Sequence, residues 1–148
     1  MSEQVGSTFT QEEIGQQAQE NANALTLVTI AYLTSKNLDV DEYAEYVGSK
    51  FAPGWAEMQG MPASALARVA ALNMVSVGAT LKSLSGDDTK ASAVISGWPS
   101  EEGRSYFGVE NAQADATLRI FGPIAENLGF AFEMSRRGDE VTMKFTKS

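Results

Sequence analysis

Hydrophobic positions in the first half of the chain recur with helical spacing. Thr10 and Glu13 form a capping-box pattern between Phe9 and Ile14, which predicts a helix from residue 10 to about residue 35. The second half of this helix is apolar around most of its circumference. We therefore expect that half to be buried in the core.

A second helix is predicted directly after a short connection. Asp39 is its expected N-cap, and Tyr43, Val47 and Phe51 recur every four residues as its expected buried stripe. Pro53 and Gly54 end this helix, and a loop is expected over 54–61.

A third helix is predicted over 62–84, because Leu66, Ala70, Val77, Leu81 and Leu84 are spaced like a packing seam. Arg68 and Lys82 are its charged residues. So few charges over about six turns predict burial on several sides, as for the central helix of the core.

Strand-like alternation begins after a turn over 85–88. Ala91, Ala93 and Ile95 share one face of a strand predicted over 90–98, which Pro99 ends. The alternation is clearest over 130–134 and 141–145, and the intervening turn over 136–139 predicts a C-terminal hairpin.

The segment between these strands carries weaker signals. Residues 100–104 are expected to be a polar loop, and Tyr106-Phe107 can belong to a short strand or to the next helix. A helix is predicted over 112–121, with a kink or break at Gly122-Pro123 and a stop at Gly129.

This order of elements predicts an α+β fold, in which an N-terminal helical layer packs on one face of a small antiparallel sheet ending in a C-terminal β-hairpin. The length of 148 residues is that of one domain, so we expect residues 1–148 to form a single unit. Residues 1–8 are small and polar, and a flexible tail is expected there.

The charge of the chain is concentrated in its first half. The net charge is -8, and residues 1–60 hold nine carboxylates against Lys36 and Lys50. Such a surface repels phosphate backbones, so nucleic acid is not an expected partner, and the helix–turn–helix spacing over 37–48 is not read as a DNA-binding motif. No signal peptide and no membrane span is recognised, which predicts a cytoplasmic protein.

The chain contains no histidine and no cysteine. This removes the usual general base, the commonest metal ligand and all thiolate chemistry, so no metal and no cofactor is expected. Carboxylate, tyrosine, lysine and arginine remain as possible catalytic groups. The adjacent acids at 87–88 and 101–102 are interpreted as solvated loop residues.

Two features indicate a place for a ligand. Aromatic and methionine side chains are concentrated over 43–61, and they predict either an adaptable apolar pocket or a core segment. Arg68 and Asn73 lie in the most apolar helix, where each needs a partner or a wet pocket. Arg68 can hold a ligand carboxylate or pair with an acid such as Glu57.

The stretch over 120–129, in which Gly122-Pro123 precede Gly129, leads into the hairpin over 130–145 and resembles the end of vinyl-reductase-like domains. The resemblance implies a mixed helix and sheet layout, similar to that of the related haem nitric-oxide-binding proteins, and binding of a small hydrophobic molecule. Domains of this family commonly carry cysteines on the hairpin, where this chain has Met134 and Met143. The family's metal and haem roles are therefore not carried over.

These observations favour a non-enzymatic sensor or carrier domain that binds a mainly apolar molecule between the helices and the sheet. The predicted ligand-binding residues are Tyr43, Tyr46, Trp55, Met58, Arg68 and Asn73. One alternative is an interaction module, such as a homodimer, that uses exposed Trp55 and Trp98. Another is a metal-independent enzyme that works with carboxylate, tyrosine or arginine side chains near Glu57 and Arg68.

Overall fold

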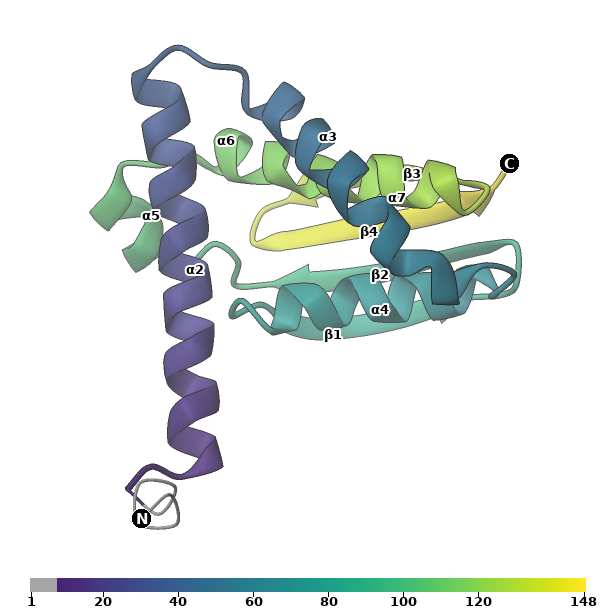
Figure 1. The fold of residues 1–148 in the computed structure, drawn as a ribbon, viewed down its shortest axis with the longest axis horizontal. Coiled ribbons are helices and arrows are strands. Elements are labelled where there is room, and N and C mark those ends of the chain that lie inside the picture. The colour runs from purple at the N-terminus through teal and green to yellow at the C-terminus, as the bar shows by residue number, and fades with distance from the viewer. Residues whose placement is uncertain (1–7) are drawn as a thin grey trace.

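The computed structural model describes residues 8–148, so all of the expected tail except Thr8 lies outside the described residues. The chain folds into helices and one four-stranded antiparallel sheet, which confirms the α+β class (Figure 1). In chain order the elements are α2 (Gln11–Ser35), α3 (Val40–Phe51), η1 (Ala52–Met58), α4 (Ala63–Val75), β1 (Thr80–Gly86), β2 (Lys90–Ser96), α5 (Glu101–Phe107), α6 (Asn111–Ala116), η2 (Thr117–Ile120), α7 (Phe121–Asn127), β3 (Phe130–Arg137) and β4 (Glu140–Lys147).

The sheet has the strand order β1-β2-β4-β3, and the predicted C-terminal hairpin is confirmed as its β3-β4 pair. Alternate residues of β2 and β4 are buried on the face that α4 and α7 cover, and the residues between them are partly exposed on the other face. Phe121 of α7 packs between the rings of Phe132 and Phe145, at centroid distances of 5.8 and 6.5 Å. The helices therefore pack on one face of the sheet, as predicted.

Small side chains separate α4 from the sheet. Ala63, Ala67, Ala70 and Ala71 are buried on the helix, and β2 contributes the buried Ala91 and Ala93. Leu66 and Met74 of α4 and Ile95 of β2 are buried as well, and where the alanines lie the helix and the strand can pack closely. This alanine layer leaves no room for a guest molecule.

The helix α2 stands across one end of the sheet, and its first half extends beyond the rest of the molecule (Figure 1). The predicted capping box is confirmed, because the Thr10 hydroxyl accepts from the Glu13 N–H and the Glu13 carboxylate accepts from the Thr10 N–H, both at 3.0 Å. No helix among the described residues has both the length and the apolar character that crossing a bilayer requires.

The prediction that the second half of α2 belongs to the core holds for one side of the helix only. Its buried apolar side chains are Leu27, Ile30 and Leu33, whereas Leu25, Val28 and Tyr32 are 67, 44 and 59% exposed. The neighbouring helices α3, α5 and α6 cover one side of α2 and leave the other side in solvent.

The predicted buried stripe of α3 is also wrong, since Val40, Ala44 and Gly48 are buried instead. These small residues let α3 approach η2 closely, and a Cβ atom at Gly48 would overlap the carbonyl oxygen of Ile120. The larger side chains of the expected stripe are turned to the side: Tyr43 and Phe51 are 36 and 53% exposed.

The third helix is shorter than predicted, since α4 ends at Val75 and residues 80–86 form the edge strand β1. Gly78, with φ of 109°, lies in the turn that separates them. Leu81 and Leu84 are three residues apart, which imitates a helical seam. A bulge between Leu81 and Ser83 places both leucines opposite the inward-facing Ile95 and Ala93, so strand geometry explains the same spacing.

Three smaller expectations also change. The loop predicted at 100–104 is the start of α5, capped by the Ser100 hydroxyl, which accepts from the Gly103 N–H at 3.0 Å. The loop expected after Pro53 is the 3-10 helix η1. The helix predicted over 112–121 changes to 3-10 geometry at η2, one turn before the expected break. Pro123 does not break the chain of helical turns, because it lies in the first turn of α7, where a backbone N–H has no partner within the helix.

Candidate functional site

A cavity of about 410 Å³ lies between the helices, and we call it the interhelical cavity. Its walls come from α2, α3, the end of α4 and η2, and no residue of the four strands lines it. The lining residues are Leu25, Thr26, Thr29, Ile30, Tyr43, Val47, Phe51, Asn73, Met74, Ser76, Val77, Trp98, Thr117, Leu118, Ile120 and Phe121.

The packing of α3 explains why this cavity exists. The small residues around Gly48 bring α3 against η2, so the larger Tyr43, Val47 and Phe51 project beside that contact rather than into it. These three side chains form the α3 wall of the cavity. The four-residue spacing identified a real stripe, which lines the cavity instead of the core.

The lining of the interhelical cavity carries no charged side chain. Its threonine hydroxyl groups are already engaged: Thr26, Thr29 and Thr117 each donate to a backbone carbonyl three or four residues earlier, at 2.6–2.8 Å. Ser76 does the same toward Asn73 at 2.6 Å. The walls therefore present mainly methyl, methylene and aromatic surface to an occupant.

Free polar groups are found toward the outside of the cavity. Asn73 donates from Nδ2 to the Val69 carbonyl at 2.9 Å, which leaves its Oδ1 atom available. The Tyr43 hydroxyl forms no hydrogen bond with the residues that the structure describes. Both side chains are partly exposed, so they can meet a polar group of an occupant without being buried unpaired.

Trp98 lines the interhelical cavity and is 2% exposed. The expectation that Trp98 is an exposed interaction residue is therefore wrong. The alternation of β2 gives no signal of this burial, because Trp98 lies two residues beyond the end of the strand and is out of phase with the buried Ala91, Ala93 and Ile95.

The six predicted site residues do not come together. Tyr43 and Asn73 line the interhelical cavity. Trp55 and Met58 pack against the core from η1, with the Trp55 ring 6.2 Å from that of Phe121. Tyr46 is 62% exposed beside Lys50, whose Nζ lies 5.4 Å from the ring centroid.

Arg68, the remaining predicted site residue, is exposed on α4 and lines a separate shallow pocket beside β1. The salt bridges within residues 8–148 join Arg119 to Asp41 and Arg136 to Asp115, so the pair proposed between Arg68 and Glu57 does not form there. The segment 43–61 is thus partly cavity wall, partly core and partly surface.

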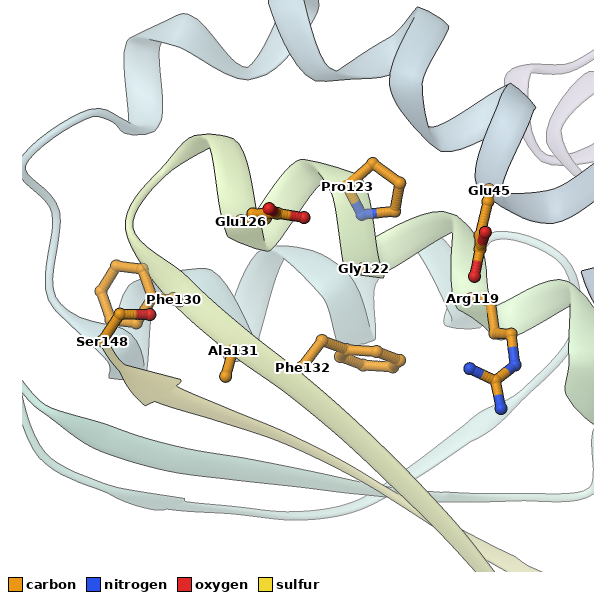
Figure 2. A pocket seen from close by; sticks show the side chains of 9 residues that line it. All are labelled: Glu45, Arg119, Gly122, Pro123, Glu126, Phe130, Ala131, Phe132 and Ser148. Atoms are coloured by element: carbon orange, nitrogen blue, oxygen red, sulfur yellow. The ribbon is translucent and has the colours of Figure 1, made fainter. Parts of the chain in front are cut away.

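A second hollow, the edge pocket, lies between α3, α7 and the outer strand β3 and measures about 470 Å³ (Figure 2). Glu45 and Arg119 lie at one end of this pocket, and Phe130 and Ser148 lie at the other. Arg119 is bound to Asp41 at 2.8 Å, and both side chains are about half exposed. The edge pocket is therefore a solvated, charged groove, although its volume is larger than that of the interhelical cavity.

The acid pair at 87–88 has a structural role at one of its members. Asp87 Oδ1 accepts hydrogen bonds from the backbone N–H of Thr89 and Lys90 at 2.9 and 3.1 Å, in the turn between β1 and β2. These bonds hold the pKa of Asp87 below its ordinary value of 3.8. Across residues 8–148, acidic side chains form no group of three or more that could hold a metal ion.

Comparison with known proteins adds no family assignment: no family model matches the chain, and no curated protein is significantly similar to it. The resemblance of residues 120–145 to vinyl-reductase-like domains stays a prediction.

Proposed function

We propose that this protein binds a small, mainly apolar, uncharged molecule in the interhelical cavity, as a carrier or sensor. The observation that carries the proposal is the lining, which combines a volume of about 410 Å³ with the absence of charged side chains. Binding sites for small molecules are typically of this size and polarity. The edge pocket is a weaker candidate, because its charged groups are solvated or already paired.

The proposed binding places the ligand between α2, α3, α4 and η2, where occupation needs no displacement of the sheet core. It also agrees with the small hydrophobic ligands implied by the resemblance to vinyl-reductase-like domains. No carboxylate, lysine or arginine lines this cavity, and Tyr43 is the titratable side chain in its lining, so the enzyme alternative would have to work through that hydroxyl.

A cavity-filling variant tests the proposal. Val47 lies half-buried in the α3 wall, so Val47→Trp should fill the cavity, while Tyr46→Trp adds the same ring to the exposed side of the helix. Titration with Nile red, a neutral apolar dye, should show binding to the native protein and to Tyr46→Trp, and about tenfold weaker binding to Val47→Trp.

Equal binding of Nile red by all three proteins would place the dye elsewhere and contradict the proposal. Native mass spectrometry of freshly purified protein provides a second readout, because a retained molecule should be absent from Val47→Trp. A native protein that binds no dye and retains no molecule would also contradict it.

We propose homodimerisation through α2 as a second candidate function. Leu25, Val28 and Tyr32 are spaced along one side of α2 and are exposed. Residues 21–35 contain no charged side chain, and the charge beside this side of the helix is that of Lys36, whose Nζ lies 5.9 Å from the Tyr32 ring centroid. This surface replaces the tryptophan-based interface predicted from the sequence, since Trp98 is buried.

Sedimentation analysis of Val28→Lys tests the dimer. The native protein should sediment as a dimer and Val28→Lys as a monomer, whereas Gln17→Lys, in the exposed first half of the same helix, should remain a dimer. A native protein that stays monomeric at high concentration would contradict this candidate and leave the cavity proposal unaffected.

A further inference from the structure

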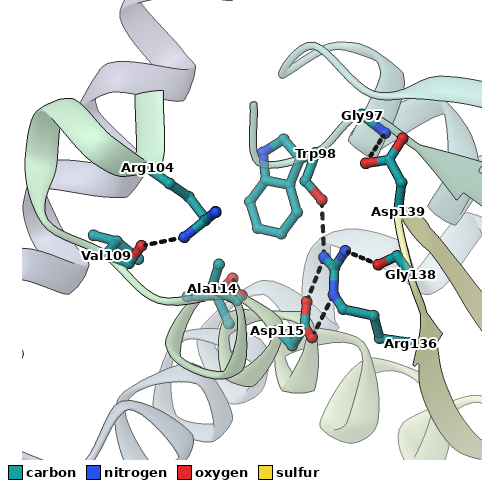
Figure 3. A network of polar contacts seen from close by, with 10 residues as sticks. Gly97, Trp98, Arg104, Val109, Ala114, Asp115, Arg136, Gly138 and Asp139 are labelled. Carbon is teal, nitrogen blue, oxygen red and sulfur yellow. Dashed lines mark hydrogen bonds and ion pairs between the residues drawn. The ribbon is translucent and has the colours of Figure 1, made fainter. Parts of the chain in front are cut away.

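Trp98 is held in place through its backbone by a network of polar contacts (Figure 3). Its carbonyl accepts from Arg136 Nη2 at 3.0 Å, and Arg136 is itself held by both carboxylate oxygens of Asp115 at 2.7 Å. The hairpin adds a contact at the neighbouring residue, where Asp139 Oδ1 accepts from the Gly97 N–H at 3.3 Å. The indole ring is therefore positioned by β2, α6 and the hairpin together.

The polar atom of this ring has no partner. Trp98 is 2% exposed, and its Nε1–H is buried without a hydrogen-bond acceptor. Indole N–H groups normally find an acceptor when they are buried, so the missing partner indicates an acceptor that is not part of the chain, either a water molecule or a group of a ligand.

A second buried atom lacks its partner in the same place. Asn23 of α2 has a buried Oδ1 atom with no hydrogen-bond donor. Asn23 and Trp98 both line a small cavity of about 190 Å³, next to Val77 and Gly78. A buried donor and a buried acceptor thus belong to one small cavity.

This small cavity adjoins the interhelical cavity, because Val77 and Trp98 line both. Binding across both cavities requires a molecule whose apolar body lies in the interhelical cavity and whose polar end passes the indole ring toward Asn23. The required end group accepts a hydrogen bond from the indole N–H and donates one to the amide oxygen. A hydroxyl does both, whereas an ether or a ketone cannot donate.

Charge excludes other end groups. Glu20, an exposed side chain that accepts from Gln16 Nε2 at 3.1 Å, also lines the small cavity, so a carboxylate or phosphate would meet a solvated like charge there and an acceptor at Asn23. An ammonium group has no lone pair to accept from the indole N–H. Among the end groups compared, the neutral hydroxyl is the one that both accepts from the indole N–H and donates to the amide oxygen.

We infer that the ligand of the interhelical cavity is an amphipathic alcohol or phenol, whose hydroxyl accepts from Trp98 Nε1–H and donates to Asn23 Oδ1. This inference rests on the proposed function and adds the chemical class of the ligand to it. Trp98 and Asn23 are then binding residues that select for the hydroxyl, and the helical walls select for the apolar body.

Three probes of similar shape test the inference: naphthalene, 2-naphthol and 2-naphthoate, measured by equilibrium dialysis. The native protein should bind 2-naphthol about tenfold more tightly than naphthalene, the effect of one well-placed hydrogen-bonding group. It should bind 2-naphthoate more weakly than 2-naphthol. Asn23→Leu and Trp98→Phe should each lower the affinity for 2-naphthol toward that for naphthalene, while Asn21→Leu, on the exposed side of the same helix, should not.

A spectroscopic readout locates the hydroxyl directly. The chain has two tryptophans, so a ¹H–¹⁵N spectrum contains two indole N–H signals, and the one absent from Trp98→Phe belongs to Trp98. Adding 2-naphthol should shift that signal downfield, whereas naphthalene should not, and the Trp55 signal serves as the internal reference. If Trp98→Phe does not fold, the affinity of Asn23→Leu for 2-naphthol and the indole N–H shift in the native protein test whether the hydroxyl binds there.

The outcomes separate the two proposals. Equal binding of naphthalene and 2-naphthol, abolished for both by Val47→Trp, would overturn the hydroxyl inference and support the cavity. Binding of 2-naphthoate as tight as that of 2-naphthol would also overturn it. Failure of all three probes to bind would count against the proposed function itself.

Discussion

The core between the sheet and helices α4 and α7 is closed to water, whereas many apolar side chains of α2 and α3 remain in contact with solvent. On the sheet side, Ile95, Val141 and Phe145 are completely buried. On the helical side, Leu25, Tyr43 and Phe51 are exposed around a cavity. The difference indicates that the free energy of folding comes mainly from the sheet side, and that the helical side is available for binding.

The largest expected effect is the removal of a ring from the closed side. Phe145→Ala should reduce the free energy of unfolding by about 3–5 kcal/mol, because it leaves a cavity beside Phe121 and Phe132. Leu25→Ala, on the open side, should change it by less than about 0.5 kcal/mol. Urea denaturation measures the free energy of unfolding of both variants. Similar losses for Phe145→Ala and Leu25→Ala would show that the sheet side does not contribute more to stability than the helical side.

The next effect concerns the ion pair that joins α6 to the hairpin. Arg136→Met should cost about 2–3 kcal/mol, because it leaves the largely buried Asp115 carboxylate unpaired. Arg137→Met, at the exposed neighbouring position, should be almost neutral. The double variant Arg136→Met/Asp115→Leu should regain much of the loss, and equal instability of the single and double variants would contradict this explanation.

A smaller effect is expected where the two sides meet. Gly48→Ala should destabilise the protein by about 1–3 kcal/mol, since the added methyl group would overlap the Ile120 carbonyl and push α3 away from η2. Gly54→Ala is the matched control, because a Cβ atom there meets nothing within 4 Å. Thermal unfolding measures the stability of both variants. Unchanged stability of Gly48→Ala would mean that the close approach of α3 is not required.

The smallest effect depends on pH and lies far from the cavity. The pKa of Asp87 is lowered in the folded state, chiefly by the Thr89 N–H, so its carboxylate stabilises the fold above pH 3.8 and loses that contribution as pH falls below this value. Asp87→Asn should therefore be slightly less stable than the native protein at pH 7, and the difference should shrink toward pH 3. Asp88→Asn is the control, because the Asp88 side chain accepts no hydrogen bond from the described residues. If the stability difference between Asp87→Asn and the native protein did not depend on pH, the stabilising role of the Asp87 carboxylate would be contradicted.

Local sequence patterns predicted those helices and strands in which the spacing of apolar residues matches a single kind of secondary structure. The alternation over 130–145 identified β3 and β4, and the Thr10 and Glu13 pattern identified the start of α2. Local spacing failed where two geometries give the same pattern. Leu81 and Leu84 fit a helix and fit a bulged strand equally well, and the choice depends on pairing with β2, which lies later in the chain.

The site was predicted less well than the fold for a related reason. Periodicity identifies the stripe formed by Tyr43, Val47 and Phe51, but the close contact between Gly48 and Ile120 decides whether the stripe lines the core or a cavity. Likewise, Trp98 and Asn23 are 75 positions apart, and nothing local in either segment indicates that both end with an unpaired buried atom beside one cavity.

The alanine layer between α4 and β2 limits how the molecule can be redesigned. Ala67, Ala70 and Ala93 have almost no side-chain volume to give up, so at these positions only a substitution by glycine could open space beneath α4. Enlarging any of them would force the helix away from the sheet. A variant meant to accept a bulkier ligand is therefore best made on the helical side, by shortening Phe51 or Val47 in the cavity wall. The sheet and the alanine layer can then keep their residues while the size of the ligand changes.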